Sequence, residues 1–450
     1  MTAGPYPAYL DGLLGDAAVA AALSAEARLK AMIRVEAALA AAQADLGLIP
    51  EAAADAIAGL ADAPPPDPAV LADAALADGV VVPGLVAALR RALPQEHAAW
   101  LHHGATSQDI EDTALCLCLR DVLAILAGRL DGVMDRLAGL AESHRATLAV
   151  AHTRGQAATP TTFGLIAAGW LAPLVRQAGR LPAIEGDALA LSLGGAAGTR
   201  AALGPSVAAI EAGMAERLGL PVPMMPWHAQ RDGVAALGGW LATLAGLLGK
   251  MAGDVALMAR SEAGGLRLAG AGGSSTMPNK RNPVRAEAIL ALARRAPGDL
   301  ATLHGALVHA EQRDGAAWQA EWAALPALAE AAGAALAHAT CLLDTLEVDA
   351  AALRAPLERD GGLVLAEAAV FALAGHMPRP AAQSAVNAAC GEALETGAPL
   401  ADVLARSVDA PVDWTAFADP ARHTGDGDAL IDRVVSARAA LSTNGSETGR

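Results

Sequence analysis

The sequence has few aromatic residues, few lysines and few cysteines. Phe, Trp and Tyr make up only 3% of the 450 residues, and Lys30, Lys250 and Lys280 are the only lysines. Strands of sandwiches, barrels and dinucleotide-binding sheets favour β-branched and aromatic side chains, so this composition argues against all three. The four cysteines follow neither a disulfide framework nor a metal-ligand spacing, and we interpret them as free thiols of a reducing compartment.

What the sequence does contain is helix-forming. Hydrophobic residues make up 54% of the chain, many of them alanine, the residue that most favours helices. Residues 109–142 lack proline, and their apolar side chains recur at steps of three and four, which predicts one long buried helix. Further helices are predicted at residues 24–46, 50–61, 206–218, 231–260, 283–308 and 322–346.

This pattern predicts an all-α protein with three domains. We place an N-terminal helical domain at residues 1–100, a central long-helix bundle at 101–346 and a C-terminal helical domain at 347–450. Helices this long and apolar need partners to cover their faces, so we expect a homo-oligomer.

The charge balance restricts the partners. Lys and Arg number 32 against 48 Asp and Glu, for a net charge of −16. Nucleic acid and anionic membrane both need a basic surface, so neither is expected to bind. The uncharged runs 155–175 and 233–249 contain polar residues or glycines, and the second is shorter than the roughly 20 residues of a membrane span. We interpret both as buried elements of the helical core and expect a soluble cytoplasmic protein.

One glycine-rich block contains several side chains that could bind or react with a substrate. Residues 272–283 read Gly-Gly-Ser-Ser-Thr-Met-Pro-Asn-Lys-Arg-Asn-Pro. Glycines let backbone amides point into a concave site, and the serines, lysine and asparagine offer donors for carboxylates. The alternative is a surface linker that happens to contain a lysine.

This block resembles the Gly-Ser-Ser-x-Met-Pro-x-Lys-x-Asn signature of the fumarase/aspartase superfamily and matches every fixed position. Residues 102–109, His-His-Gly-Ala-Thr-Ser-Gln-Asp, resemble its Thr-Ser-x-Asp segment, although alone they read equally well as a helix cap. Residues 151–164 resemble its Gly-Gln…Pro-Thr-Thr-Phe-Gly segment. Residues 227–232, Trp-His-Ala-Gln-Arg-Asp, resemble its Gln-Arg-Asp segment in the form found in cycloisomerases.

The resemblance implies a three-domain, all-α fumarase/aspartase-like fold with a long central helical bundle. It also implies a homotetramer whose active sites are shared between subunits, and a small dicarboxylate or tricarboxylate substrate. It requires no cofactor and no metal. His228, His304 and His309 were considered as metal ligands, but their spacing matches no zinc pattern.

The resemblance also implies roles for individual residues. Ser274 is the expected base, its alkoxide stabilised by glycine-loop amides and by Lys280, and Ser275 is the neighbour most easily confused with it. The expected substrate-binding residues are His102, Thr106, Ser107, Gln156, Thr161, Gln230, Arg231, Met277, Lys280 and Asn282.

The chain departs from the superfamily pattern at Arg154. Elimination members have a histidine there that is linked to acid catalysis, and His152 falls where the family has arginine. Arginine cannot act as an acid at working pH, but it can hold a carboxylate through two parallel hydrogen bonds. We therefore include Arg154 among the catalytic residues. The bland alternative is that Arg154 packs at a subunit interface against an acidic neighbour.

This departure bears on the reaction. A leaving amine or hydroxide benefits from a general acid, whereas lactone opening expels a carboxylate that needs no proton. The departure therefore suits a cycloisomerase better than a lyase of amines. The resemblance, which is strongest for the superfamily's cycloisomerases, implies interconversion of 3-carboxy-cis,cis-muconate and carboxymuconolactone in protocatechuate catabolism. The alternatives are an adenylosuccinate-lyase-like β-elimination that releases fumarate from a succinyl substrate and a structural role of the lens-crystallin kind.

Overall fold

Long helices dominate the computed structural model, which describes residues 7–269, 272–273, 276–277 and 279–447. Contacts divide the chain into two compact units. The first comprises Met1–Leu130, Gln177–Gly249 and Ala288–His338, and the second comprises Asp131–Arg176, Lys250–Glu287 and Ala339–Arg450. The predicted domain boundaries near residues 100 and 346 stay a prediction.

The all-α prediction is confirmed in the described part of the chain. Its longest helices are α8 (Ser107–Ser143), α9 (Phe163–Ala188), α11 (Asp232–Met258), α12 (Val284–Ala306) and α13 (Gly315–Asp344). Along α8 the predicted apolar residues are all buried: Leu115, Leu119, Val122, Leu126, Leu130, Val133 and Leu137.

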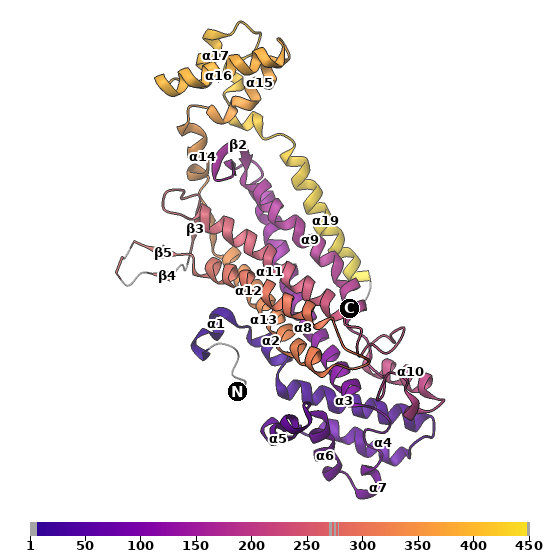
Figure 1. Ribbon diagram of the computed structural model, residues 1–450. Coiled ribbons are helices and arrows are strands. Elements are labelled where there is room, and N and C mark those ends of the chain that lie inside the picture. Colours follow the sequence, from indigo (N-terminus) through magenta and orange to yellow (C-terminus); the bar gives the residue numbers. More distant parts are fainter. Residues whose placement is uncertain (1–6, 270–271, 274–275, 278, 448–450) are drawn as a thin grey trace. The chain divides into compact units, whose positions relative to one another are not determined.

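The other helices of the first unit precede α8 in the chain, except for α10, which follows it. They are α1 (Asp11–Leu14), α2 (Ala17–Ala22), α3 (Ala25–Asp45), α4 (Glu51–Ala58), α5 (Pro68–Asp78), α6 (Val82–Ala92), α7 (Gln95–Ala98) and α10 (Val207–Leu218). Ser24 caps α3 as expected, because its hydroxyl accepts a hydrogen bond from the amide of Ala27 at 3.2 Å. Helix α3 lies beside α4 and α10 (Figure 1), and its buried face includes Met32, Ile33 and Leu39.

The second unit holds its own core. Its further helices are α14 (Ala350–Arg359), α15 (Ala366–Ala374), α16 (Arg379–Thr396), α17 (Leu400–Ser407), α18 (Trp414–Phe417) and α19 (Gly427–Glu447). Helices α15, α16 and α17 lie together (Figure 1). Their core cluster includes Leu373, Val386, Leu404 and Trp414. Single turns of 3₁₀ helix lie at Ala8–Leu10, Gly59–Asp62, Ala201–Leu203, Leu363–Leu365 and Pro420–His423.

Short antiparallel strand pairs interrupt the helices. The pairs are β1 (Leu148–Thr153) with β2 (Gln156–Thr162), β3 (Leu266–Leu268) with β6 (Leu346–Val348), and β4 (Gly272–Gly273) with β5 (Arg281–Asn282). The prediction that residues 155–175 are buried core elements was wrong for the first residues of this segment. Gln156 is exposed, because β2 begins at a hairpin turn, and only the later part of β2 and α9 enter the core.

Two helices, α11 and α13, are long and apolar enough to cross a membrane by length and composition alone, and the bent pair Ala8–Leu14 with Ala17–Asp45 passes the same test as one span. In α11 and α13, however, 61% and 67% of the most apolar window is buried inside the protein. Packing within the fold therefore accounts for much of their apolar character.

Candidate active site

The first turn of α8 positions a fully buried carboxylate. Asp109 is 0% exposed, and its Oδ2 accepts a hydrogen bond from the backbone amide of Thr106 at 2.9 Å, which caps the helix. The amides of Gly194 and Gly195 donate to its two oxygens at 2.6 and 3.0 Å. His228 Nε2 lies 2.8 Å from Oδ1. The carboxylate thus ties the glycine turn and the Trp-His segment to the start of α8.

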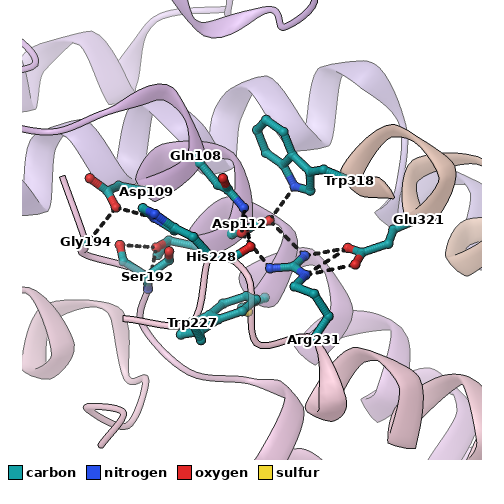
Figure 2. A network of polar contacts seen from close by, with 12 residues as sticks. Gln108, Asp109, Asp112, Ser192, Gly194, Trp227, His228, Arg231, Trp318 and Glu321 are labelled. Atoms are coloured by element: carbon teal, nitrogen blue, oxygen red, sulfur yellow. Dashed lines mark hydrogen bonds and ion pairs between the residues drawn. The ribbon is translucent and has the colours of Figure 1, made fainter. Parts of the chain in front are cut away.

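One turn further along α8, Asp112 belongs to a buried ion cluster (Figure 2). Arg231 Nη1 and Nη2 donate to its two oxygens at 2.8 and 3.2 Å, and Trp318 Nε1 donates at 2.9 Å. Arg231 Nε also donates to both oxygens of Glu321, at 2.9 and 3.1 Å. Burial lowers the pKa of Arg231, but the two carboxylates outweigh it and raise the pKa above its ordinary value. Arg231 therefore stays charged.

Neighbouring side chains fix the chain segments that carry this cluster. The Thr113 hydroxyl donates to the carbonyl of Ser192 at 3.1 Å and accepts from its amide at 3.0 Å. Trp227 Nε1 donates to the carbonyl of Leu191 at 3.0 Å, and the Arg231 guanidinium lies over the Trp227 ring (Figure 2). These bonds hold the segments before and after α10 against α8.

A pocket of about 310 Å³ opens beside Asp109 and His228. Its wall is formed by Ala197, Gly198, Thr199, Met225, Pro226, His228, Ala229, Gln230, Glu311 and Gln312. The side chains of Thr199, Gln230 and Gln312 provide hydroxyl and amide donors suited to a carboxylate.

Arg313 borders the predicted threonine. Its Nη1 donates to the Thr106 hydroxyl at 2.9 Å, and its Nε donates to Gln108 Oε1 at 3.1 Å. Gln108 in turn donates to Asp112 at 3.1 Å and to the carbonyl of His228 at 3.0 Å. Thr106 and Ser107 are half-buried, so the start of α8 remains partly accessible. Arg313 therefore places a positive charge at the accessible start of α8.

His102 precedes this helix in a left-handed backbone conformation, with φ of 62°. Its Nδ1 lies 2.6 Å from Oε1 of Glu36, a carboxylate that is 1% exposed. Burial lowers the pKa of His102, but the hydrogen bond and charge of Glu36 and the charge of Asp109 outweigh it, so the pKa is raised above its ordinary value.

In the second unit, Arg154 lies at the tip of the β1–β2 hairpin. Thr153 pairs with Gln156, and the two residues between them have positive φ, 51° for Arg154 and 82° for Gly155. Such a two-residue turn matches the twist of the strands but strains a residue that has a Cβ atom. Arg154 and Gln156 are exposed, whereas Thr161 on β2 is only 8% exposed.

The signature block forms part of a second hairpin. Gly272 pairs with Asn282 and Gly273 with Arg281, and the amide of Lys280 donates to the carbonyl of Met277 at 3.0 Å. Lys280 and Met277 are exposed, and Asn282 is half-buried. The predicted base Ser274 and its neighbour Ser275 lie outside the described residues.

The chain also matches known proteins. A protein-family model described as "Lyase" covers residues 16–298. A 3-carboxy-cis,cis-muconate cycloisomerase of Bradyrhizobium diazoefficiens is 40% identical over an alignment of 434 residues that covers 94% of this chain and 96% of that protein. A nitrosuccinate lyase of Streptomyces davaonensis is 40% identical over 437 residues, covering 93% and 92%. The crystal structure of 3-carboxy-cis,cis-muconate lactonizing enzyme from Pseudomonas putida matches with a TM-score of 0.90 and 35% identity, covering 96% and 99%.

The chain belongs to the fumarase/aspartase superfamily. It has the all-α fold of these enzymes and is itself an enzyme. Within that frame, the structure brings together one group of predicted residues in the first unit: His102, Thr106, Ser107, Gln230 and Arg231. The remaining described ones, Arg154, Gln156, Thr161, Met277, Lys280 and Asn282, belong to the second unit.

Two of the residues that the superfamily resemblance assigns to substrate binding are buried in the single chain, and their assignment stays a prediction. Arg231 is 2% exposed and directs its guanidinium at two protein carboxylates, so in the single chain it holds Asp112 and Glu321 together. Thr161 is buried within the hairpin packing, so it is not exposed to a ligand in the single chain. Neither burial shows in the sequence, because a motif records residue type and spacing but not what lies around the side chain.

The motifs do not single out three residues of the candidate site. The sequence presents His228 as a candidate metal ligand and Asp109 as one position of a motif, and it gives Arg313 no distinguishing motif. The one signal for Arg313 was its place in the polar run 311–314 between two helices. Among the described residues, no group of three or more His, Cys, Asp or Glu side chains is arranged to hold a metal ion.

Proposed function

We propose that this enzyme is a cycloisomerase that interconverts 3-carboxy-cis,cis-muconate and carboxymuconolactone in the catabolism of protocatechuate. The observation that carries the proposal is the 40% identity to the Bradyrhizobium cycloisomerase over 94% of the chain. The likeness to the Pseudomonas lactonizing enzyme, also nearly end to end, supports it.

The proposed chemistry is proton transfer at a carbon next to a carboxylate. In the lactonising direction, a carboxylate of the muconate attacks the double bond, and Ser274 delivers a proton to the neighbouring carbon. Negative charge grows on the adjacent carboxylate during this step, and Lys280 and Asn282 are the donors we assign to it. In the reverse direction the serine removes that proton and the lactone oxygen leaves as a carboxylate.

Arg154 takes the role of receiving that carboxylate. It is exposed, and no described residue forms an ion pair or hydrogen bond with its guanidinium, so its donors remain available to an anion. A bidentate arginine–carboxylate pair stabilises the departing charge without supplying a proton. This suits lactone opening and disfavours expulsion of an amine.

We also propose that the enzyme acts as a cytoplasmic homotetramer with active sites shared between subunits. The support is that Arg154, Met277 and Lys280 are exposed in a single chain. In a tetramer, neighbouring subunits would cover them. Light scattering on the active enzyme tests this, and a monomer mass with full activity would reject it.

A second candidate is elimination of nitrite from nitrosuccinate, because the Streptomyces nitrosuccinate lyase is also 40% identical over nearly the whole chain. This reaction is a β-elimination that yields fumarate from a succinyl substrate. Nitrite, like a carboxylate, is a weak base and leaves without a proton. Arg154 therefore serves either reaction, and it separates both from adenylosuccinate cleavage, whose leaving group is an amine.

The deciding experiment is a side-by-side assay of the purified enzyme with 3-carboxy-cis,cis-muconate, nitrosuccinate and adenylosuccinate. We expect loss of muconate absorbance with formation of the lactone, and little or no fumarate from the other two. Formation of fumarate and nitrite from nitrosuccinate, with no lactone from the muconate, would replace the first candidate with the second.

A further inference from the structure

The proposed steps do not use the Asp109–His228 pair. Asp109 accepts hydrogen bonds from the backbone amides of Thr106, Gly194 and Gly195, and each of these groups can only donate. An oxygen surrounded in this way acts as an ionised acceptor. The proton between Asp109 and His228 therefore belongs to the imidazole, which fixes its neutral tautomer as Nε2–H.

In this tautomer, His228 Nδ1 is the ring nitrogen that carries no hydrogen and can take up a proton. The histidine side chain is 3% exposed, and no described residue makes a hydrogen bond to Nδ1. A Cβ atom added to Gly194 would lie 2.7 Å from Cε1 and 3.1 Å from Nδ1, so only glycine leaves room for this edge of the ring. The same histidine lines the 310 Å³ pocket. Buried polar atoms without a partner are uncommon and call for an explanation, and a ligand in this pocket is one that would supply the partner.

We propose that His228 is a substrate-binding residue that takes up a proton when a substrate carboxylate enters this pocket. A carboxylate has only acceptor oxygens, so Nδ1 must carry a hydrogen to bind it. The imidazolium then donates Nε2–H to Asp109 and Nδ1–H to the substrate. The proton comes from solvent and returns to it on release, and no covalent bond changes. The inference rests on the proposed function only in taking the substrate to be a polycarboxylate.

The charges around His228 favour this state. Asp109 on α8 contributes a buried negative charge 2.8 Å from Nε2. Arg231, three residues along, is balanced by Asp112 and Glu321, and Arg313 lies on the far side of Gln108. Glu311 adds a further negative charge to the pocket wall. Of these groups, the Asp109 carboxylate is the one in direct contact with the ring, and it can accept the Nε2–H of a charged imidazolium.

The test uses the full-length enzyme and tricarballylate, a tricarboxylate that has neither a double bond nor a leaving group and so cannot react. Isothermal titration at about pH 8, above the ordinary histidine pKa of about 6.5, is run in two buffers with different heats of ionisation. We expect uptake of one proton for each ligand bound by the wild type. Absence of tricarballylate binding, or binding without proton uptake, would overturn the proposal.

Two variants locate the proton. His228→Gln retains an amide donor for Asp109 but cannot become charged, so proton uptake should vanish and affinity should fall about tenfold to a hundredfold. The matched control is His338→Gln, which alters another buried histidine of the same unit, bonded to the carbonyl of Leu13 and not part of the pocket. It should keep both affinity and proton uptake. Unchanged binding and uptake in His228→Gln would reject the assignment.

A measurement on the wild type guards against misfolding of the variant. Nitrogen-15 NMR of the histidine side chains should show His228 as the Nε2–H tautomer when free and protonated on both nitrogens with tricarballylate bound. An Nδ1 that stays unprotonated in the complex contradicts the proposal. Because tricarballylate does not react, a failure of the muconate assay with intact proton uptake would remove the proposed reaction and leave this site standing.

Discussion

In the first unit, the charged side chains of Asp109, Asp112, Arg231 and Glu321 are buried and paired, whereas Arg154 and Lys280 of the second unit lie exposed on or beside two hairpins. Asp112, Arg231 and Glu321 are each at most 2% exposed and complete one another's hydrogen bonds. Arg154 and Lys280 are exposed, and no described residue pairs with them. The difference separates charges that a single chain needs in order to fold from charges kept available for a ligand or another subunit.

The sharpest test of this division is on the signature block. Ser274→Ala should abolish nearly all turnover and leave thermal unfolding unchanged, because the proposed function assigns its hydroxyl to proton transfer. Ser275→Ala is the matched control and should be milder. Steady-state assays with both variants check the assignment, and a dead Ser275→Ala beside an active Ser274→Ala would reverse the roles of the two serines.

Breaking the buried cluster should have the largest effect on stability. Arg231→Met removes the cation and leaves Asp112 and Glu321 buried without it, which costs about 3–5 kcal/mol. The control is Arg354→Met, which removes an exposed partner of Glu358 and should cost about 0–1 kcal/mol. Denaturant unfolding measures both. A rise in KM with unchanged stability in Arg231→Met would instead support Arg231 as a substrate contact.

Arg154 should show the opposite behaviour. Arg154→Ala should lower turnover about tenfold to a hundredfold, as expected for losing a charged hydrogen-bonding pair worth about 1.5–3 kcal/mol, while the melting temperature stays the same. Arg154→Lys should also lose activity, because a lysine cannot form the bidentate contact.

The control for Arg154 is Arg406→Ala, an exposed arginine of the same unit paired with Glu392. It should change neither turnover nor melting temperature. A destabilised Arg154→Ala enzyme with normal turnover would place Arg154 in an interface and withdraw it from the reaction.

The smallest expected effect is a pH dependence from the buried His102–Glu36 pair. The folded pKa of His102 is raised above its ordinary value, so its protonated form stabilises the fold. This contribution is fully present below the unfolded pKa of about 6.5 and is lost as pH rises through the higher folded pKa. The difference in unfolding free energy between wild type and His102→Gln should therefore shrink on going from acidic to alkaline pH. A difference that stays constant or grows would contradict this.

The helices were the part of the molecule that the sequence predicted best. The stripe from Leu115 to Leu137 on α8 required only the periodicity of apolar side chains, and every member is buried. Pro297 and Pro326 lie inside α12 and α13, where packing of the apolar faces outweighs the local penalty of proline. The β1–β2 hairpin was missed, because Thr-Arg-Gly-Gln carries only one glycine and lacks the usual Asn-Gly turn pair.

The sequence predicted which segments carry the residues of the candidate site, but not which of their side chains contact one another. Motif spacing placed Thr106, Gln230 and Arg231 in functional segments, yet it contains no information on which side chain faces which. Asp109 and His228 are 119 positions apart, and their contact depends on how the glycine turn folds against α8. The distinction between a buried ion cluster and an open anion site likewise arises only from three-dimensional packing.

The close approach of Gly194 to His228 has a consequence for how this chain diverges from its relatives. A methyl group at residue 194 would overlap the imidazole edge and lie 3.0 Å from Pro226 Cβ, so alanine there requires a smaller side chain at 228 and some movement of Pro226. If alanine appeared at residue 194 while His228 was still present, the two side chains would overlap. The two positions are therefore coupled in evolution: relatives that keep histidine at 228 should keep glycine at 194, and relatives that lose the histidine should be the first to admit a side chain in the turn.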